Sequence, residues 1–223
     1  MKKIIVLLML LSLYILATPS KVVYIPNTSF NGLGNLHLDV DNYFITSKKG
    51  TSLTEIGVSM QVLPFKEIKL ELSADYKANL DSPIYLAGKL VLPMKKFPNI
   101  ALGVFNLGVN SETLKPVYYL LFSYRVSKVG KFLFGGYYGD KGMLRDNDGD
   151  VDNKGLLVGY ENTINKNLYL GIDYFMGENI LSAFSIGMGW RFAKNVKIKV
   201  AWHLKLKESM SNLLSFQVNI NTF

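Results

Sequence analysis

The chain has 223 residues, and its 25 lysine and arginine residues outnumber its 17 aspartate and glutamate residues, which gives a formal net charge of +8. The absence of cysteine excludes a disulfide framework and a cysteine-linked lipid anchor. The length fits one domain. The basic residues are dispersed and form no single block, so we expect no nucleic-acid partner.

The first twenty residues are organised like a secretory signal peptide. Two lysines precede an apolar run at residues 4–16, and small residues follow at 17–20. The apolar run is shorter than the roughly 20 residues that a transmembrane helix needs. We therefore expect residues 1–20 to be a cleaved signal peptide. Residues 21–34 are expected to form a periplasmic N-terminal segment or a partial plug.

Beyond this segment, apolar residues recur at every second position. The clearest case is the stretch from Leu181 to Leu206, where the alternation holds on both sides of a short polar connection at 193–195. A period of two places side chains on alternate faces of a β-strand, which predicts a hairpin here. The same alternation predicts twelve strands, near residues 36–44, 55–62, 68–77, 84–92, 100–105, 118–125, 131–138, 156–161, 168–174, 182–192, 196–206 and 214–221.

One face of these strands is apolar and the other carries charges, serine and glycine. This predicts an all-β fold, a transmembrane antiparallel up-and-down β-barrel of about 12 strands at residues 35–223. Short connections such as 127–130 are expected in the periplasm, and the long connection 140–153 outside the cell. The alternative is a soluble barrel or sandwich with the apolar face inward. Twelve strands would then enclose too much space to fill, which favours the membrane barrel.

The pattern resembles the small bacterial outer-membrane β-barrels of the porin-like kind over Asn35 to Phe223. Such barrels usually end in a phenylalanine that is read by the barrel-insertion machinery. Phe223 ends this chain, although it is out of phase with the lipid-facing positions Leu214 and Phe216. The resemblance implies the outer membrane of a Gram-negative-type envelope, with outer-membrane lipid and the insertion machinery as partners.

Charged residues on the polar face are expected to line the lumen. The basic ones are Arg125, Arg191, Lys197, Lys199 and Lys205, and the acidic ones are Asp39, Asp41, Glu55, Glu71 and Asp75. Twelve strands leave about 12 Å between opposing side chains. That width suits a narrow channel for small polar or anionic solutes. The alternative is a structural or envelope-interaction barrel whose lumen is closed by ion pairs and tyrosines.

A third interpretation is an outer-membrane lipid-modifying enzyme. If Phe192 pairs with Val196 across the short turn, then Ser185 lies opposite His203 and beside Asp173. A serine, a histidine and an acid are the components of a hydrolytic triad. All three would face the lumen, where membrane lipid does not reach, so we expect no enzyme.

The connection at 146–153 has a composition that favours calcium. Asp146, Asp148, Asp150 and Asp152 alternate with other residues around Gly149. Calcium prefers several oxygen ligands from a flexible loop. The spacing departs from an EF-hand, which has glycine at the sixth position, so a solvated acidic loop is the alternative. No other cofactor is expected.

Overall fold

The computed structural model describes residues 21–29, 32–47, 52–63, 65, 67–78, 80–94 and 97–222. The predicted signal peptide and Phe223 lie outside these residues. In the described part of the chain, no helix is long and apolar enough to cross a membrane.

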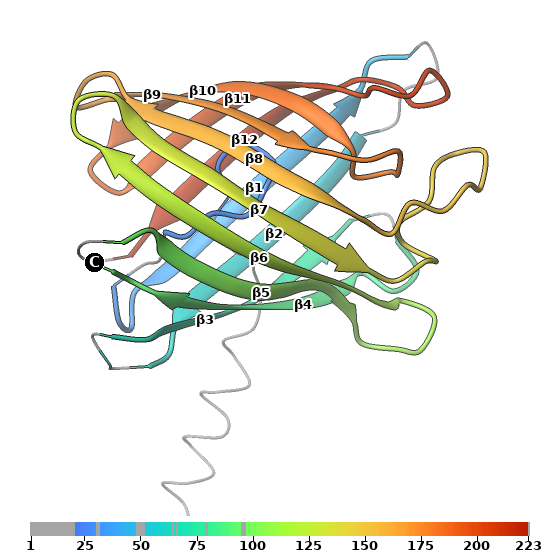
Figure 1. Ribbon diagram of the computed structural model, residues 1–223, viewed down its shortest axis with the longest axis horizontal. Helices are drawn as coiled ribbons and strands as arrows, with labels where there is room; N and C mark the ends of the chain where they lie inside the picture. The colour runs from blue at the N-terminus through green and yellow to red at the C-terminus, as the bar shows by residue number, and fades with distance from the viewer. Residues whose placement is uncertain are drawn as a thin grey trace, which may run out of the picture.

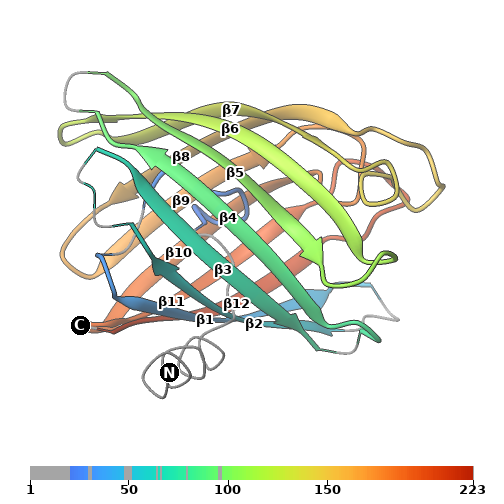
Figure 2. The same ribbon diagram turned by 90° about the horizontal axis from the view of Figure 1, so that it is seen from below.

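Twelve antiparallel strands form one closed barrel, which confirms the predicted fold class (Figures 1 and 2). Each strand pairs with its neighbours in the sequence, and β1 pairs with β12 to close the barrel. The strands are β1 (Leu36–Ile45), β2 (Ser52–Gln61), β3 (Lys69–Lys77), β4 (Ile84–Leu92), β5 (Asn99–Gly108), β6 (Leu114–Val126), β7 (Gly130–Gly139), β8 (Lys154–Thr163), β9 (Leu168–Phe175), β10 (Ala183–Ala193), β11 (Val196–Leu204) and β12 (Leu213–Asn221).

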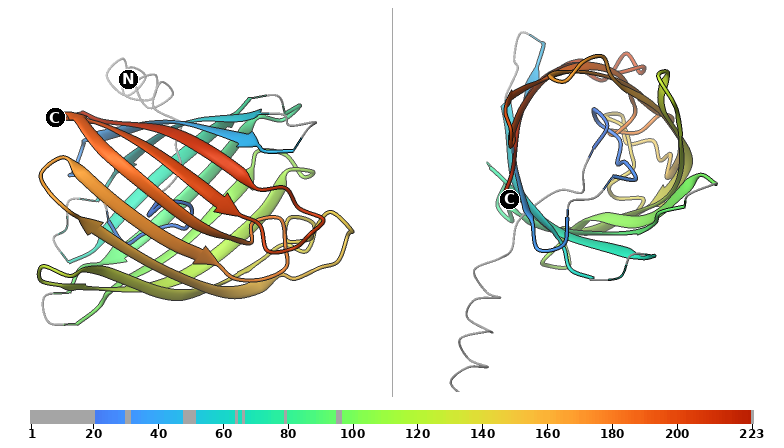
Figure 3. Two further views of the ribbon diagram at one scale, coloured as in Figure 1. Left: turned by 90° about the horizontal axis from the view of Figure 1, so that it is seen from above. Right: turned by 90° about the vertical axis from the view of Figure 1, so that its left-hand side faces the viewer.

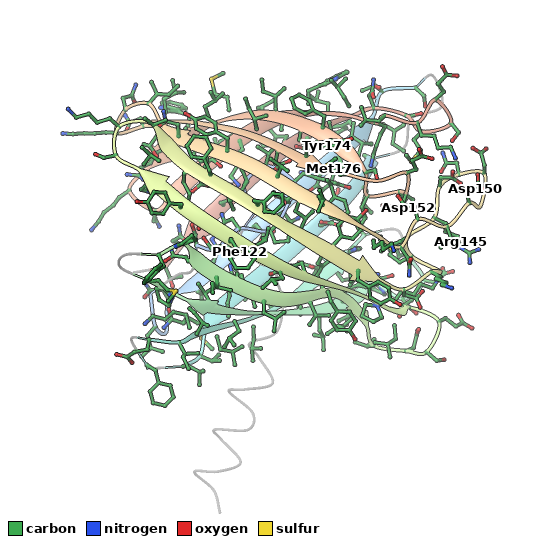
Figure 4. All side chains as sticks on the ribbon, in the orientation of Figure 1. Phe122, Arg145, Asp150, Asp152, Tyr174 and Met176 are labelled. Atoms are coloured by element: carbon green, nitrogen blue, oxygen red, sulfur yellow. The ribbon has the colours of Figure 1, made fainter. Side chains whose placement is uncertain are left out.

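The apolar face of the sheet points outward and the charged face points inward. Leu102, Phe134 and Met188 are each 56% exposed on the outer surface, which is crowded with carbon-rich side chains in Figure 4. Inward-facing Asp41 and Glu71 are almost completely buried. An apolar outer belt around a polar interior is the arrangement of a membrane barrel. It excludes the alternative in which the apolar face forms a core.

The two ends of the barrel differ in their connections. One end, here called the turn end, carries the connections 62–68, 93–98, 127–129, 164–167 and 194–195. The other end, here called the loop end, carries the long connection 140–153, as Figure 1 shows on its right-hand side. Figure 4 places Arg145, Asp150 and Asp152 in this loop. The longest connection thus lies at the end opposite to these five connections, as the sequence pattern predicts.

Regular alternation is interrupted at two places, which together shift the register of three strand pairs. In the hairpin of β10 and β11, Ala193 pairs with Val196, and the register shifts between Arg191 and Ala193. The predicted pairing of Phe192 with Val196 is therefore wrong, because one extra residue is accommodated at the turn. In β5, Asn106 adopts a positive φ of 61° at a second register shift. This turns the Asn106 side chain inward, where it is buried.

Candidate functional site

Residues 21–29, here called the lumen segment, lie inside the barrel. Figure 3 shows this segment in blue within the ring of strands when the barrel is viewed along its length. Val22, Val23 and Ile25 are buried there almost completely. The lumen segment forms ion pairs and hydrogen bonds with side chains of eight strands: β1, β2, β4, β6, β7, β9, β11 and β12. Because these strands surround the lumen, the segment spans the interior.

Asp173 on β9 is the main anchor of the lumen segment. Its Oδ2 atom accepts hydrogen bonds from the backbone amides of Val23 and Tyr24, both at 2.8 Å, and of Ile25 at 3.2 Å. Gln217 donates to the carbonyl of Val23 at 3.2 Å. A carboxylate that accepts several amide hydrogen bonds compensates for the loss of its hydration. The wall thus satisfies backbone groups that would otherwise be buried without partners.

Inward-facing glycines on β8, β9 and β10 make room for the lumen segment. A Cβ atom at Gly171 would lie 2.6 Å from a methyl carbon of Val23, and one at Gly187 would lie 3.0 Å from Val23. At Gly159 a Cβ atom would lie 3.0 Å from Ile25. Gly171 and Gly187 are direct partners across the sheet. Together they form a groove whose shape fits valine and isoleucine side chains.

The predicted acidic residues all face the interior and are buried. Asp41 pairs with Lys21 of the lumen segment at 3.3 Å, and Glu55 lies 3.6 Å from both Lys21 and Lys77. Glu71 pairs with Lys89 at 3.2 Å, and neither side chain is reached by solvent. Asp39 lies 3.9 Å from the ring of His37, and Asp75 is buried on β3. The carboxylates are thus engaged in a network of interactions within the barrel.

The predicted basic residues lie in a different electrostatic setting. Arg125 lies 3.5 Å from Glu161, but more than half of its side chain is exposed. The other four lie on β10, on β11 and just after β11. Among the described residues, no carboxylate forms an ion pair with Arg191, Lys197, Lys199 or Lys205. This wall of the lumen therefore carries excess positive charge.

Ser185, His203 and Asp173 are neighbours, as the strand register requires. His203 Nδ1 lies 2.9 Å from the hydroxyl of Ser185, and its Nε2 lies 2.8 Å from the hydroxyl of Ser215. A hydrolytic triad instead needs the acid to orient the histidine through its second nitrogen. Here Asp173 binds the backbone of the lumen segment. The arrangement is a buried hydrogen-bond network with no triad geometry.

The acidic loop interacts with a lysine from the neighbouring loop. Lys207 Nζ forms an ion pair with Asp146 and also lies 3.7 Å from Asp148 and 3.4 Å from Asp150. The second oxygen of Asp146 accepts the backbone amides of Asp148 and Asp150. Asp152 instead accepts the amide of Glu178. Among the described residues, no three acidic or histidine side chains converge on a metal position. Calcium binding stays a prediction.

Sequence reasoning did not identify the partners of the lumen segment. Two of these partners are lysines of the barrel wall: Lys89 donates to the carbonyl of Ser29 at 2.6 Å, and Lys131 donates to the hydroxyl of Ser29 at 3.1 Å. The available signal was the recurrence of glycine at inward positions of three consecutive strands. These glycines leave space on the inner wall, but the alternation does not show which segment occupies that space.

Comparison with known proteins supports the fold. No family model and no curated protein matches the chain. An outer membrane channel from Pseudomonas putida F1 superposes with a TM-score of 0.58 at 9% identity, covering 92% of this chain and 100% of that one. The KdgM porin, solved with disordered oligogalacturonate, gives 0.57 at 12% identity over 84% and 99%. The NanC porin gives 0.55 at 10% over 83% and 99%. The chain therefore has a porin-like outer-membrane barrel fold.

Proposed function

We propose that this protein is an outer-membrane channel that passes small polar or anionic solutes through a lumen narrowed by residues 21–29. The observation that carries the proposal is the unequal pairing of lumen charges. The carboxylates of β1, β2 and β3 interact with neighbouring groups, whereas Lys197 and Lys199 on β11 have no carboxylate partner among the described residues. A wall with excess positive charge lowers the energy of an anion in a narrow pore.

Several features support a location in the outer membrane. The outer surface is apolar over the strands, and the solved structures of similar fold are outer-membrane proteins. Outer-membrane lipid would then surround the barrel, and the barrel-insertion machinery would assemble it. The signal-peptide pattern at residues 1–20 agrees with export.

A barrel with a closed lumen is the second candidate, and a specific observation favours it. Lys89 and Glu71 are completely shielded from solvent, and the lumen segment contacts strands all around the interior. Such a protein would act in the envelope through its loops and would carry no current. An outer-membrane lipid-modifying enzyme has no supporting observation, since the Ser185 hydroxyl lies in a buried network away from lipid.

Current recordings in planar lipid bilayers separate these candidates. We expect discrete conductance steps, and a reversal potential in a KCl gradient that indicates anion preference. The double variant Lys197→Gln, Lys199→Gln should reduce this preference, because it removes two unpaired positive charges. The double variant Lys141→Gln, Lys154→Gln removes two exposed charges at the loop end; it is the matched control and should leave the preference unchanged. Absence of any conductance from correctly folded protein would reject the channel and favour the closed barrel.

A further inference from the structure

The lumen segment divides the interior, and a cavity lies on its loop-end side. The cavity has a volume of about 410 Å³, and its lining includes Tyr24 and Pro26 of the segment. Sites for small organic molecules have volumes of about 300–1,000 Å³. The cavity is thus large enough to hold a molecule of one or two rings.

Apolar side chains from many elements converge on this cavity. They come from the strands, from the lumen segment and from three loops at the loop end, and include Tyr24, Tyr43, Phe105, Met143, Ile180 and Met210. Tyr24 lies at the centre of this set, with its ring 6.3 Å from that of Tyr43 and 6.5 Å from that of Phe175. A polar solute gains little from such surfaces, whereas an apolar ring or chain is stabilised by its removal from water.

The cavity lining has one more lysine than it has carboxylates. Three lysines and two carboxylates contribute to it, and Glu55 lies 3.6 Å from both Lys21 and Lys77. The second carboxylate, Asp75, has interactions of its own. The third lysine, Lys205, has no ion-pair partner in the described part of the chain. Its ammonium donates to the carbonyl of Ile180 and lies 5.4 Å from the ring centre of Tyr24.

We propose that this cavity binds a small amphipathic monoanion, with an aromatic or aliphatic body against Tyr24 and Phe105 and an acidic group on Lys205. The inference rests on the proposed channel function and names the solute class that it would select. An ammonium without a carboxylate partner can form a charge-assisted hydrogen bond with a ligand acid group. The apolar lining supplies affinity, and Lys205 supplies selection for the anion.

Isothermal titration calorimetry with naphthoate tests the proposal on the purified barrel in a non-ionic detergent, after subtraction of the heat measured with protein-free micelles. We expect one binding site per barrel for naphthoate. The neutral analogue naphthalenemethanol should bind more weakly, and acetate should not bind at the same concentration. Lys205→Gln should weaken naphthoate binding about tenfold, the effect of losing one hydrogen bond to a charged group, and should leave naphthalenemethanol binding unchanged.

Two further variants make the result specific. Lys197→Gln removes another lumen lysine whose ammonium lies against an aromatic ring, that of Tyr169, but Lys197 is outside the cavity lining. It should not change naphthoate binding. Phe105→Ala should weaken naphthoate and naphthalenemethanol equally, since both lose the same apolar contact. Heat-modifiable migration on gels verifies that each variant is folded.

The proposal is overturned if naphthoate gives no heat above that of the micelles. It is also overturned if Lys205→Gln and Lys197→Gln reduce binding equally, because general attraction to a basic lumen would then explain the effect. Calorimetry needs no ion flow, so its outcome is independent of the conductance test. A barrel that conducts but does not bind naphthoate retains the channel function and loses only this site.

Discussion

The two halves of the barrel interior differ in the side chains that occupy the lumen. Toward the turn end, ion pairs such as Glu71–Lys89 and Lys131–Glu161 fill the space together with Ser29 of the lumen segment. Toward the loop end, apolar side chains such as Phe105 surround an unfilled cavity. The first half gains order from partners fixed within the chain. In the second half the ion pairs of Lys21 and Lys77 with Glu55 lie in the cavity wall, and the side chains there leave a volume of about 410 Å³.

The largest effect is expected for the buried ion pair of the turn-end half. Lys89→Met leaves the Glu71 carboxylate buried without its principal counter-charge, at a cost of about 3–5 kcal/mol in the free energy of unfolding. The double variant Lys89→Met, Glu71→Leu should recover most of that loss, since it leaves no unpaired charge. Urea unfolding of the barrel in lipid vesicles measures both. If the single and double variants were equally unstable, the pair would not be the stabilising unit.

A smaller effect is expected where the lumen segment crosses between the halves. Gly171→Ala places a methyl group 2.6 Å from Val23, an overpacking that should cost about 1–3 kcal/mol. Val23→Ala in the same chain should recover part of this loss, because it removes the colliding methyl group while the Tyr169 ring stays close to the new Cβ atom. Gly88→Ala is the control, since its Cβ atom would meet only ordinary contacts. Urea unfolding in vesicles again provides the values, and no recovery in the double variant would contradict the groove.

The smallest effect is expected at the loops that cover the cavity. The hydrogen bond from Lys207 lowers the pKa of the Asp146 carboxyl below its ordinary value, and the same bond raises the pKa of Lys207. A lowered carboxyl pKa means that the stabilisation is present at neutral pH and is lost as the pH falls through that pKa. Lys207→Gln should therefore increase hydrogen exchange of the 140–153 amides about two- to fivefold at neutral pH.

Hydrogen exchange also supplies the control for these loops. The difference between the protein and Lys207→Gln should disappear only as the pH falls through the lowered pKa of Asp146, which lies below the ordinary aspartate value of about 3.9. Lys154→Gln, a neighbouring change at the start of β8, should leave exchange of the loop unaltered. Equal exchange in all three proteins at neutral pH would show that the ion pair does not order the loop.

The barrel could be predicted from the sequence because its signal is local and repeated. Leu70 and Leu72, for example, alternate with Lys69, Glu71 and Ser73 along one strand, because lipid contacts one face of a membrane barrel and the polar lumen the other. The neighbouring positions of Ser185 and His203 followed from strand pairing alone. The register at the turn after Arg191 could not be predicted from the sequence, because a bulge of a single extra residue does not visibly change the alternation of apolar and polar residues.

The site was less accessible from the sequence because it depends on contacts between distant residues. Asp173 has the same pattern of neighbours as any inward-facing acid, and nothing local indicates that it binds amides 150 residues earlier in the chain. The Asn106 side chain faces the lumen because the backbone at Asn106 has a positive φ, which the sequence does not indicate. The cavity is formed by loops, strands and the lumen segment together, so no single stretch encodes it.

Single-channel conductance in planar bilayers tests most directly whether the lumen segment narrows a channel. Asp173→Ala removes the acceptor of three backbone hydrogen bonds from the segment and should loosen it. Asp148→Ala, on the loop, is the control that changes charge by the same amount. We predict that Asp173→Ala conducts more than the unaltered protein and that Asp148→Ala does not. Equal conductance in all three proteins would contradict the proposal that the lumen segment narrows the channel.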